Sequence, residues 1–146
     1  MAHGAIDTHI RRTPGEVFAV IADVSKNVRW SSSAVEGRQT TPGPTGVGTT
    51  AHEVSMFLGR RIEVDSVVTE FVPGRRLSYR TSGGPFPFSG SFDISEEPGG
   101  ARVTATFEAA LPGSFGLVDT LFAALVRRKF SRDLSNLKRL MDTGEL

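Results

Sequence analysis

A long helical stripe at the end of the chain constrains the fold more than any other feature of the sequence. Apolar residues recur through residues 114–141 with a mean spacing of about 3.7, which is the period of an α-helix. The stripe consists of Phe115, Val118, Phe122, Val126, Phe130, Leu134, Leu137 and Met141. A helix of this length extends for about 42 Å and must bury one face along its length. The rest of the chain therefore has to supply a broad apolar surface that matches it.

Short segments of alternating hydrophobicity occupy most of the chain before that helix. Stretches rich in glycine and proline interrupt them, and glycine accounts for 16 of the 146 residues. Alternation of this kind predicts half-buried strands, and connections this short predict consecutive antiparallel hairpins. The predicted strands cover residues 3–11, 34–40, 47–57, 60–71, 76–82, 86–95 and 101–110.

Two short helices are predicted between the first and second strands. Thr13 is a suitable N-cap, Pro14 suits the first helical position, and Glu16 completes a capping box. Ser25 is placed to cap a second helix over residues 26–30. This order of elements, a strand followed directly by two adjoining helices, helps to identify the fold.

The pairing of neighbouring strands can be predicted by matching their apolar faces. In residues 47–57 and 60–71 the more apolar face is the even-numbered one, and a three-residue loop, Phe57-Leu58-Gly59, brings the two faces together. The same reasoning applied to two further hairpins completes one buried face of the sheet. The predicted pairs are Val54 with Ile62, His52 with Val64, Val68 with Leu77, Ser66 with Tyr79, Ile94 with Val103, Phe92 with Ala105 and Phe88 with Ala109.

The order of these elements predicts an α+β fold. A sheet and a helix that each have one apolar face bury both faces by packing together. We therefore expect a curved seven-stranded antiparallel sheet wrapped around the long C-terminal helix, with two short helices between strands one and two. The sequence contains no repeat and no long linker, which predicts a single domain over residues 1–146.

The composition excludes several classes of site and partner. The absence of cysteine removes disulfides, thiolate metal ligands and cysteine nucleophiles. The histidines His3, His9 and His52 lack the spacing of a metal motif, so we expect neither a metal nor a cofactor. A net charge of +1 argues against nucleic acid as a partner. Apolar runs far shorter than the ~20 residues of a membrane span, and no signal-peptide core, predict a cytoplasmic protein without stable membrane insertion.

Several short motifs occur in an order that resembles a known superfamily. They are Pro14-Gly15-Glu16-Val17-Phe18, Asp23-Val24-Ser25 with Arg29-Trp30, Gly46-Val47-Gly48-Thr49, Leu58-Gly59-Arg60 and Pro73-Gly74-Arg75-Arg76-Leu77. The chain resembles the polyketide cyclase/dehydrase and lipid transport superfamily (START-related, SRPBCC) over essentially its whole length. The resemblance implies a helix-grip fold with a hydrophobic cavity between the sheet and the C-terminal helix. Lipids, sterols, polyketides or other apolar molecules occupy such a cavity, and no single reaction is implied.

The predicted ligand-binding residues lie on the inward face of the sheet, on the helix stripe and after the second short helix. For the aromatic residues an ordinary packed core is the alternative to a cavity lining. For Trp30 that alternative is a packing anchor between the short helix and the next strand. The predicted set is Trp30, His52, Val54, Ser66, Tyr79, Phe88, Phe92, Phe107, Phe115 and Phe122.

His52 and Tyr79 are weak candidates for acid–base chemistry because the predicted register points both inward. A polar residue in an apolar pocket orients a ligand or exchanges a proton with it. The alternative for His52 is a ring at the sheet edge, satisfied by water. A register slip of one residue would turn His52 outward and Glu53 inward. Glu63 and Asp65 are expected to face solvent.

These observations favour a carrier or sensor that binds a hydrophobic small molecule. The alternative is a polyketide cyclase/dehydratase-like enzyme that uses a polar residue in the same cavity. Basic residues of the last helix, such as Arg127 and Lys129, suit either an anionic surface or an ordinary solvated helix face, and the solvated face is favoured. A homodimer is possible. The ligand itself is not identified by the sequence.

Overall fold

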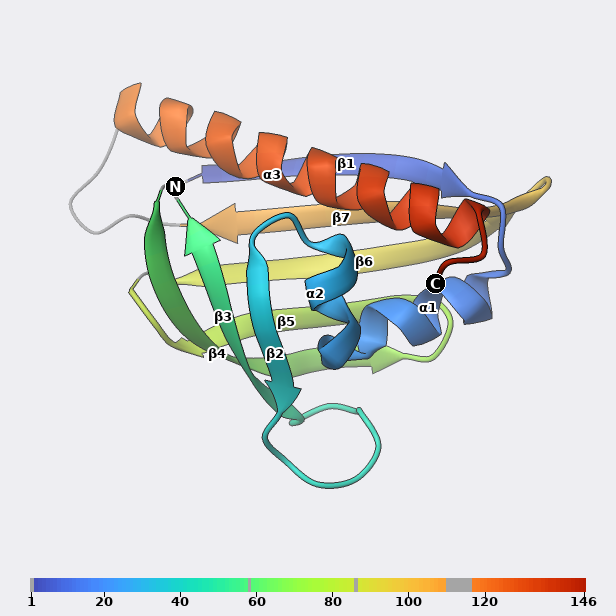
Figure 1. Ribbon diagram of the computed structural model, residues 1–146, viewed down its shortest axis with the longest axis horizontal. Coiled ribbons are helices and arrows are strands. Elements are labelled where there is room, and N and C mark those ends of the chain that lie inside the picture. The colour runs from blue at the N-terminus through green and yellow to red at the C-terminus, as the bar shows by residue number, and fades with distance from the viewer. Residues whose placement is uncertain (1, 58, 86, 110–116) are drawn as a thin grey trace.

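The computed structural model describes residues 2–57, 59–85, 87–109 and 117–146, and these residues form one curved antiparallel sheet with a long helix across its concave side (Figure 1). The helix is α3 (Leu117–Asp142). The spatial order of the strands is β1-β7-β6-β5-β4-β3-β2. The strands are β1 (Ala2–Ile10), β2 (Ala34–Gln39), β3 (Thr50–Phe57), β4 (Arg60–Val72), β5 (Arg76–Gly83), β6 (Phe88–Glu97) and β7 (Gly100–Ala109). The predicted α+β helix-grip fold is confirmed.

Two short helices and a 3-10 turn connect β1 to β2. Helix α1 (Pro14–Ala22) begins with the predicted capping box, in which the Thr13 side chain accepts a hydrogen bond from the Glu16 backbone. A 3-10 turn, η1 (Val24–Lys26), and helix α2 (Asn27–Trp30) follow. The cap of this second unit is Asp23, whose Oδ1 accepts from the Ser25 backbone nitrogen at 3.1 Å, so the prediction that Ser25 is the cap is wrong.

The β6–β7 hairpin has the predicted register. Ile94 pairs with Val103, and the other two predicted pairs are also present. The connection is the two-residue turn Pro98-Gly99, in which Gly99 has a φ of 81°. This left-handed conformation suits glycine, which has no Cβ to clash. The observed register and the two-residue turn of this hairpin are therefore consistent with each other.

The β3–β4 hairpin is shifted by one residue from the prediction. Phe57 pairs with Arg60, so two residues connect the strands instead of three, and Val54 stands opposite Glu63 instead of Ile62. Because successive side chains on a strand alternate between faces, this shift reverses the faces of β3. The odd-numbered residues of β3 point toward α3, and the predicted inward face of this strand is wrong.

The β4–β5 pairing keeps the predicted faces but changes the partners. Val68 pairs with Tyr79, and Ser66 pairs with Thr81. The turn lies between the paired residues Val72 and Arg76, and a register irregularity between Val68 and Glu70 changes the pairing by one position. Because the partners move by two positions along β5, the even-numbered residues of β4 still face inward.

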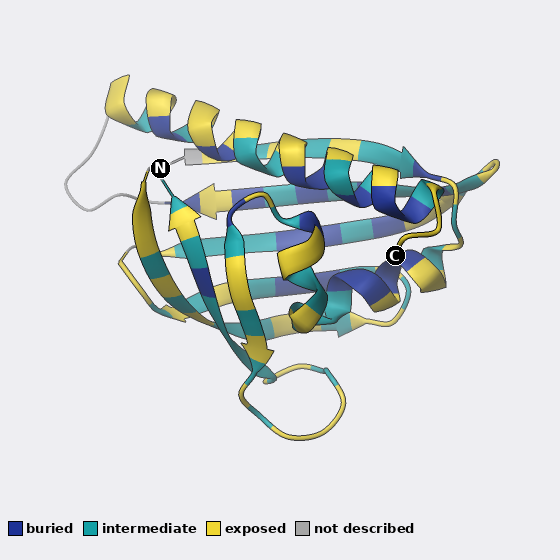
Figure 2. Cartoon of the chain, in the orientation of Figure 1, coloured by how far each residue is buried: buried dark blue, intermediate teal, exposed yellow. Residues whose placement is uncertain are grey.

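The main core lies where α1 and the C-terminal half of α3 cover the sheet (Figure 2). Val17 of α1, Val103 of β7 and Leu137 of α3 are completely buried there. A smaller cluster, built around Phe107 and Phe122, lies under the first turns of α3. Val118 belongs to the predicted stripe but is 52% exposed, so the buried stripe begins later than expected.

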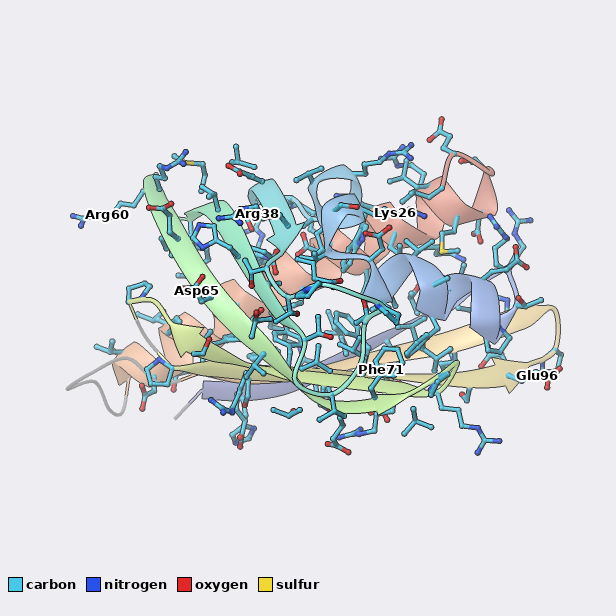
Figure 3. The ribbon with its side chains drawn as sticks, turned by 90° about the horizontal axis from the view of Figure 1, so that it is seen from below. Lys26, Arg38, Arg60, Asp65, Phe71 and Glu96 are labelled. Carbon is cyan, nitrogen blue, oxygen red and sulfur yellow. The ribbon has the colours of Figure 1, made fainter. Side chains whose placement is uncertain are left out.

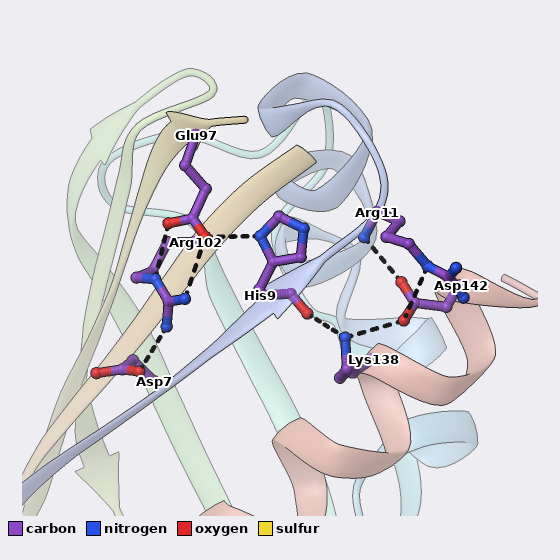
Figure 4. A network of polar contacts seen from close by, with 7 residues as sticks. All are labelled: Asp7, His9, Arg11, Glu97, Arg102, Lys138 and Asp142. Atoms are coloured by element: carbon purple, nitrogen blue, oxygen red, sulfur yellow. Dashed lines mark hydrogen bonds and ion pairs between the residues drawn. The ribbon is translucent and has the colours of Figure 1, made fainter. Parts of the chain in front are cut away.

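Polar contacts attach the C-terminal end of α3 to β1 (Figure 4). Lys138 Nζ donates to the His9 carbonyl at 2.6 Å and lies 3.0 Å from Asp142 Oδ2. The Arg11 backbone nitrogen donates to Asp142 Oδ1 at 2.8 Å. His9 in turn contacts Glu97 at 2.6 Å. This end of the helix is therefore held to the sheet by both apolar and polar contacts.

Candidate functional site

A cavity of about 240 Å³ lies between the sheet and the middle of α3. The inward faces of β3, β4, β5 and β6 form one wall, and α2 and α3 form the other. Two groups of side chains line it. We call Phe57, Ile62, Val64, Phe88 and Val126 the apolar end, and Asn27, Trp30, Ser33, Glu53, Lys129 and Asp133 the polar end.

The cavity exists because β3 presents short side chains to the interior. Ala51 and Ser55 line the cavity on either side of Glu53. Small side chains at these positions cannot reach across to α3, and the curvature of the sheet carries β3 away from the helix (Figure 1). Space therefore remains between β3 and α3, whereas Phe92 and Ile94 of β6 and Leu137 and Met141 of α3 fill the space at the main core.

Trp30 lines the polar end of the cavity. It is 5% exposed and meets the Phe92 ring edge-on, with 6.2 Å between ring centroids. Its Nε1 has no hydrogen-bond partner. The Trp30 ring therefore packs against β6 and lines the cavity, whereas the packing alternative placed it between the short helix and the next strand.

Glu53 reaches the cavity from β3, as the one-residue slip in register requires. Its Oε2 accepts a hydrogen bond from Asn27 Nδ2 at 3.3 Å. Burial raises the pKa of Glu53, and the Asn27 hydrogen bond and the charge of Lys129 oppose that rise. The carboxyl group is therefore held closer to neutrality than a carboxyl group in solvent.

Lys129 and Asp133 form an ion pair on the wall contributed by α3. Lys129 Nζ lies 2.6 Å from Asp133 Oδ2, and Asp133 is 1% exposed. Asp133 Oδ1 also accepts from the backbone nitrogen and the hydroxyl of Ser32, both at 2.7 Å. The expectation of a solvated face is wrong for Lys129, and Asp133 lies on the same buried side of the helix. Their spacing of three and seven residues from Val126 places them on the buried stripe, which was the available signal.

His52 lies on the outer face of β3, so the prediction that it points inward is wrong. Its cross-strand partners are Arg38 on β2 and Asp65 on β4, both labelled in Figure 3. His52 Nδ1 lies 2.7 Å from Asp65 Oδ1, and Nε2 lies 3.3 Å from Glu63 Oε1. The hydrogen bond to Asp65 raises the pKa of His52. Val54 shares this outer face and is buried outside the cavity.

The remaining predicted aromatic residues fall into two groups. Tyr79, Phe88 and Phe92 line the cavity, and the Tyr79 ring stacks with Phe88 at 6.1 Å and with Phe92 at 6.2 Å. Phe107 and Phe122 belong to the smaller core cluster beside the cavity. Phe115 lies outside the described residues. Among the predicted residues that are not aromatic, Ser66 lines the cavity from β4.

Tyr79 fills the space left by a glycine on the neighbouring strand. A Cβ on Gly90 would lie 2.7 Å from the Tyr79 hydroxyl oxygen, so the tyrosine ring lies directly against the Gly90 backbone. Burial raises the pKa of Tyr79 above its usual value of 10.0. The hydroxyl keeps its proton at neutral pH and cannot serve there as a general base.

Neither a metal site nor a membrane-spanning helix is found in the part of the chain that the structure describes. No three His, Cys, Asp or Glu side chains among residues 2–57, 59–85, 87–109 and 117–146 come together in a group able to hold a metal ion. None of the helices over the same residues is long and apolar enough to cross a bilayer.

Comparison with known proteins identifies the family. The family model described as "Polyketide cyclase / dehydrase and lipid transport" matches residues 1–142. The chain belongs to this family. Uncharacterized protein Rv2574 of Mycobacterium tuberculosis is 30% identical over 134 residues, which cover 89% of this chain and 78% of that protein. Uncharacterized protein Mb2604 of Mycobacterium bovis is similar to the same extent.

Solved structures share the fold of this family member. The TTHA0849 protein of Thermus thermophilus superposes with a TM-score of 0.83 at 17% identity, covering 99% of each chain. A START superfamily protein of Mycobacterium smegmatis superposes with a TM-score of 0.82 at 10% identity, covering 98% of this chain and 99% of that one. At these identities the similarity shows the fold alone. The kind of ligand that the cavity binds therefore has to be inferred from the cavity's own side chains.

Proposed function

We propose that this protein binds a hydrophobic small molecule, such as a lipid, sterol, polyketide or aromatic compound, as a carrier or sensor. The observation that carries the proposal is the cavity between the sheet and α3, whose apolar end remains open between two closely packed clusters. Membership of a family described by polyketide and lipid chemistry supports it.

The physical argument rests on the cost of an unfilled apolar space. Side chains that face a void lose the dispersion contacts that a packed interior provides. Apolar surface inside a cavity takes up apolar molecules readily. Phe57, Ile62 and Val64 would regain these contacts on binding a ligand of matching shape.

Trp30 provides a direct test because it is the only tryptophan of the chain and lines the cavity. We expect its fluorescence to change on titration with apolar probes, and native mass spectrometry to show a one-to-one complex. Ala51→Phe fills the cavity from β3 and should abolish both signals. His52→Phe adds a phenyl group at the adjacent position on the outer face and should leave both signals unchanged. The absence of uptake of every lipid, sterol and aromatic probe by the unmodified protein would overturn the proposal.

An enzyme of the cyclase/dehydratase type is the second candidate, and Glu53 is the observation that favours it. A carboxyl group whose pKa is raised by burial in a cavity is better matched to proton transfer at neutral pH than a carboxyl group in solvent. Dehydration of a β-hydroxy carbonyl compound needs a base for the α-proton and an acid for the departing hydroxyl. Glu53→Gln should abolish such turnover while binding persists. Equal turnover by both proteins would exclude Glu53 from catalysis.

A further inference from the structure

We infer that the polar end of the cavity recognises a neutral hydroxyl group, an alcohol or a phenol, on an otherwise apolar ligand, and that it disfavours carboxylates. This inference rests on the proposed function, and it specifies the chemical class of ligand that the cavity accepts.

Three buried polar atoms at the polar end have no hydrogen-bond partner. They are Asn27 Oδ1, Trp30 Nε1 and Ser33 Oγ, and they are the complete set of such side-chain atoms within the residues that the structure describes. Trp30 is 5% exposed and Ser33 is 9% exposed. Buried polar groups are nearly always paired, and leaving one unpaired is costly. All three belong to residues that line one cavity, which indicates that a ligand supplies the missing partners.

The chemistry of two of these atoms restricts that ligand. Trp30 Nε1–H can only donate a hydrogen bond, and Asn27 Oδ1 can only accept one. The two residues are three positions apart in α2, so their side chains lie on the same side of the helix. A hydroxyl group accepts through its oxygen and donates through its hydrogen, and it can therefore satisfy both. A ketone can serve Trp30 alone, and a hydrocarbon can serve neither.

The charges around the polar end disfavour an anionic head group. Lys129 is the cation on this wall, and it is already paired with Asp133 at 2.6 Å. Glu53 adds a second carboxyl group in the same cavity. A ligand carboxylate would have to lie beside these two acidic groups with no unpaired cation among the residues that define the polar end. A neutral hydroxyl avoids this repulsion.

Three ligands with one apolar body and different heads test the inference. Calorimetric titration at pH 7 would compare naphthalene, 2-naphthol, which is neutral at this pH, and 2-naphthoate. We expect 2-naphthol to bind about tenfold more tightly than naphthalene, and 2-naphthoate to bind more weakly than both. Equal affinity for naphthalene and 2-naphthol, or tightest binding of 2-naphthoate, would overturn the inference and leave the proposed function standing. The absence of binding by all three would count against both.

Two variants locate the hydroxyl. Trp30→Phe removes the donor and keeps an aromatic ring, and Asn27→Ala removes the acceptor. Each should reduce the preference for 2-naphthol over naphthalene to about threefold or less, with naphthalene affinity nearly unchanged. Ser95→Ala removes a hydroxyl from an exposed position on β6 outside the cavity and should keep the full preference. A preference that survives both substitutions at the polar end would show that the hydroxyl is held elsewhere.

Discussion

The β6–β7 and β3–β4 hairpins belong to one sheet but bury their side chains in different ways. In β6–β7 the inward face packs against the main core, where Ile94 is 5% exposed and Val103 is completely buried. In β3–β4 the inward face borders the cavity, and the opposite face contains both the ion-paired His52 and the buried Val54. The first hairpin has one apolar face, and the second has polar and apolar residues on both.

This difference explains why the register could be predicted for one hairpin and not for the other. A one-residue slip in β6–β7 would expose a whole apolar face, so the hydrophobic pattern specifies its register. In β3 a slip exchanges Ala51, Glu53 and Ser55 for His52, Val54 and Met56, and the hydrophobic pattern favours the wrong set. A cavity wall need not be apolar at every position. The hydrophobic pattern therefore specifies the register least well in the strands that line the site.

The largest expected difference is in the cost of truncating one isoleucine on each hairpin. Ile94→Ala leaves a void in the main core and should lower the free energy of unfolding by about 2–5 kcal/mol. Ile62→Ala enlarges an existing cavity from a half-buried position and should cost less than about 1.5 kcal/mol. Urea denaturation of both variants measures the difference. Equal losses would show that the β4 wall is packed as closely as the core.

Substitution of Gly90 should give the next largest change in stability. Gly90 lies on β6, and its backbone contacts the cavity residue Tyr79 on β5. In Gly90→Ala the new Cβ would lie 2.9 Å from Tyr79 Cζ, which forces the ring toward the cavity. We expect a loss of roughly 1–3 kcal/mol in stability and weaker binding of apolar probes. Gly15→Ala, in α1 with nothing within 4 Å, should instead gain roughly 0.5 kcal/mol. Unaltered stability of Gly90→Ala would contradict the close contact with Tyr79.

Glu53 should make the stability of the cavity hairpin depend on pH. Because burial raises its folded-state pKa above the usual 4.5, the stability associated with Glu53 is fully present below pH 4.5 and is lost as the pH rises through the folded-state pKa. Glu53→Gln removes this loss. The variant should therefore gain stability relative to the unmodified protein as the pH rises above 4.5.

Chemical denaturation at several pH values measures this gain. The difference between the two proteins isolates Glu53 from the carboxylates whose pKa is lowered by partners elsewhere, such as Glu97 beside Arg102. A difference that stays constant with pH would show that Glu53 titrates as it does in the unfolded chain.

His52 should give the smallest effect on binding. His52→Gln changes the outer face of β3, so the affinity for apolar probes should stay within about twofold. The pKa of His52 is raised above 6.5, chiefly by Asp65, so its contribution to stability is present below pH 6.5 and is lost as the pH rises through the folded-state pKa. NMR titration of the imidazole protons should give a midpoint above 6.5. A large loss of probe binding in this variant would show that His52 contributes to the cavity after all.

Local physical chemistry was sufficient to predict much of this protein from its sequence. The capping box at Thr13 depends on residues three apart, the stripe of α3 on a helical period, and the β6–β7 register on one apolar face with a two-residue turn. The resemblance of several short motifs was sufficient to predict the family. Each of these signals lies within a few neighbouring residues or extends along a whole element.

Only the tertiary structure decided which polar residues reach the cavity. Glu53 faces inward because β3 pairs with β4 one residue away from the register that its own hydrophobic pattern favours. Lys129 and Asp133 lie on the helical stripe that the sequence shows, but the room for their ion pair beside Ser32 exists because the sheet curves away from the middle of α3. A cavity is defined by space that the chain does not fill, and the pattern of residues that do fill space cannot specify it.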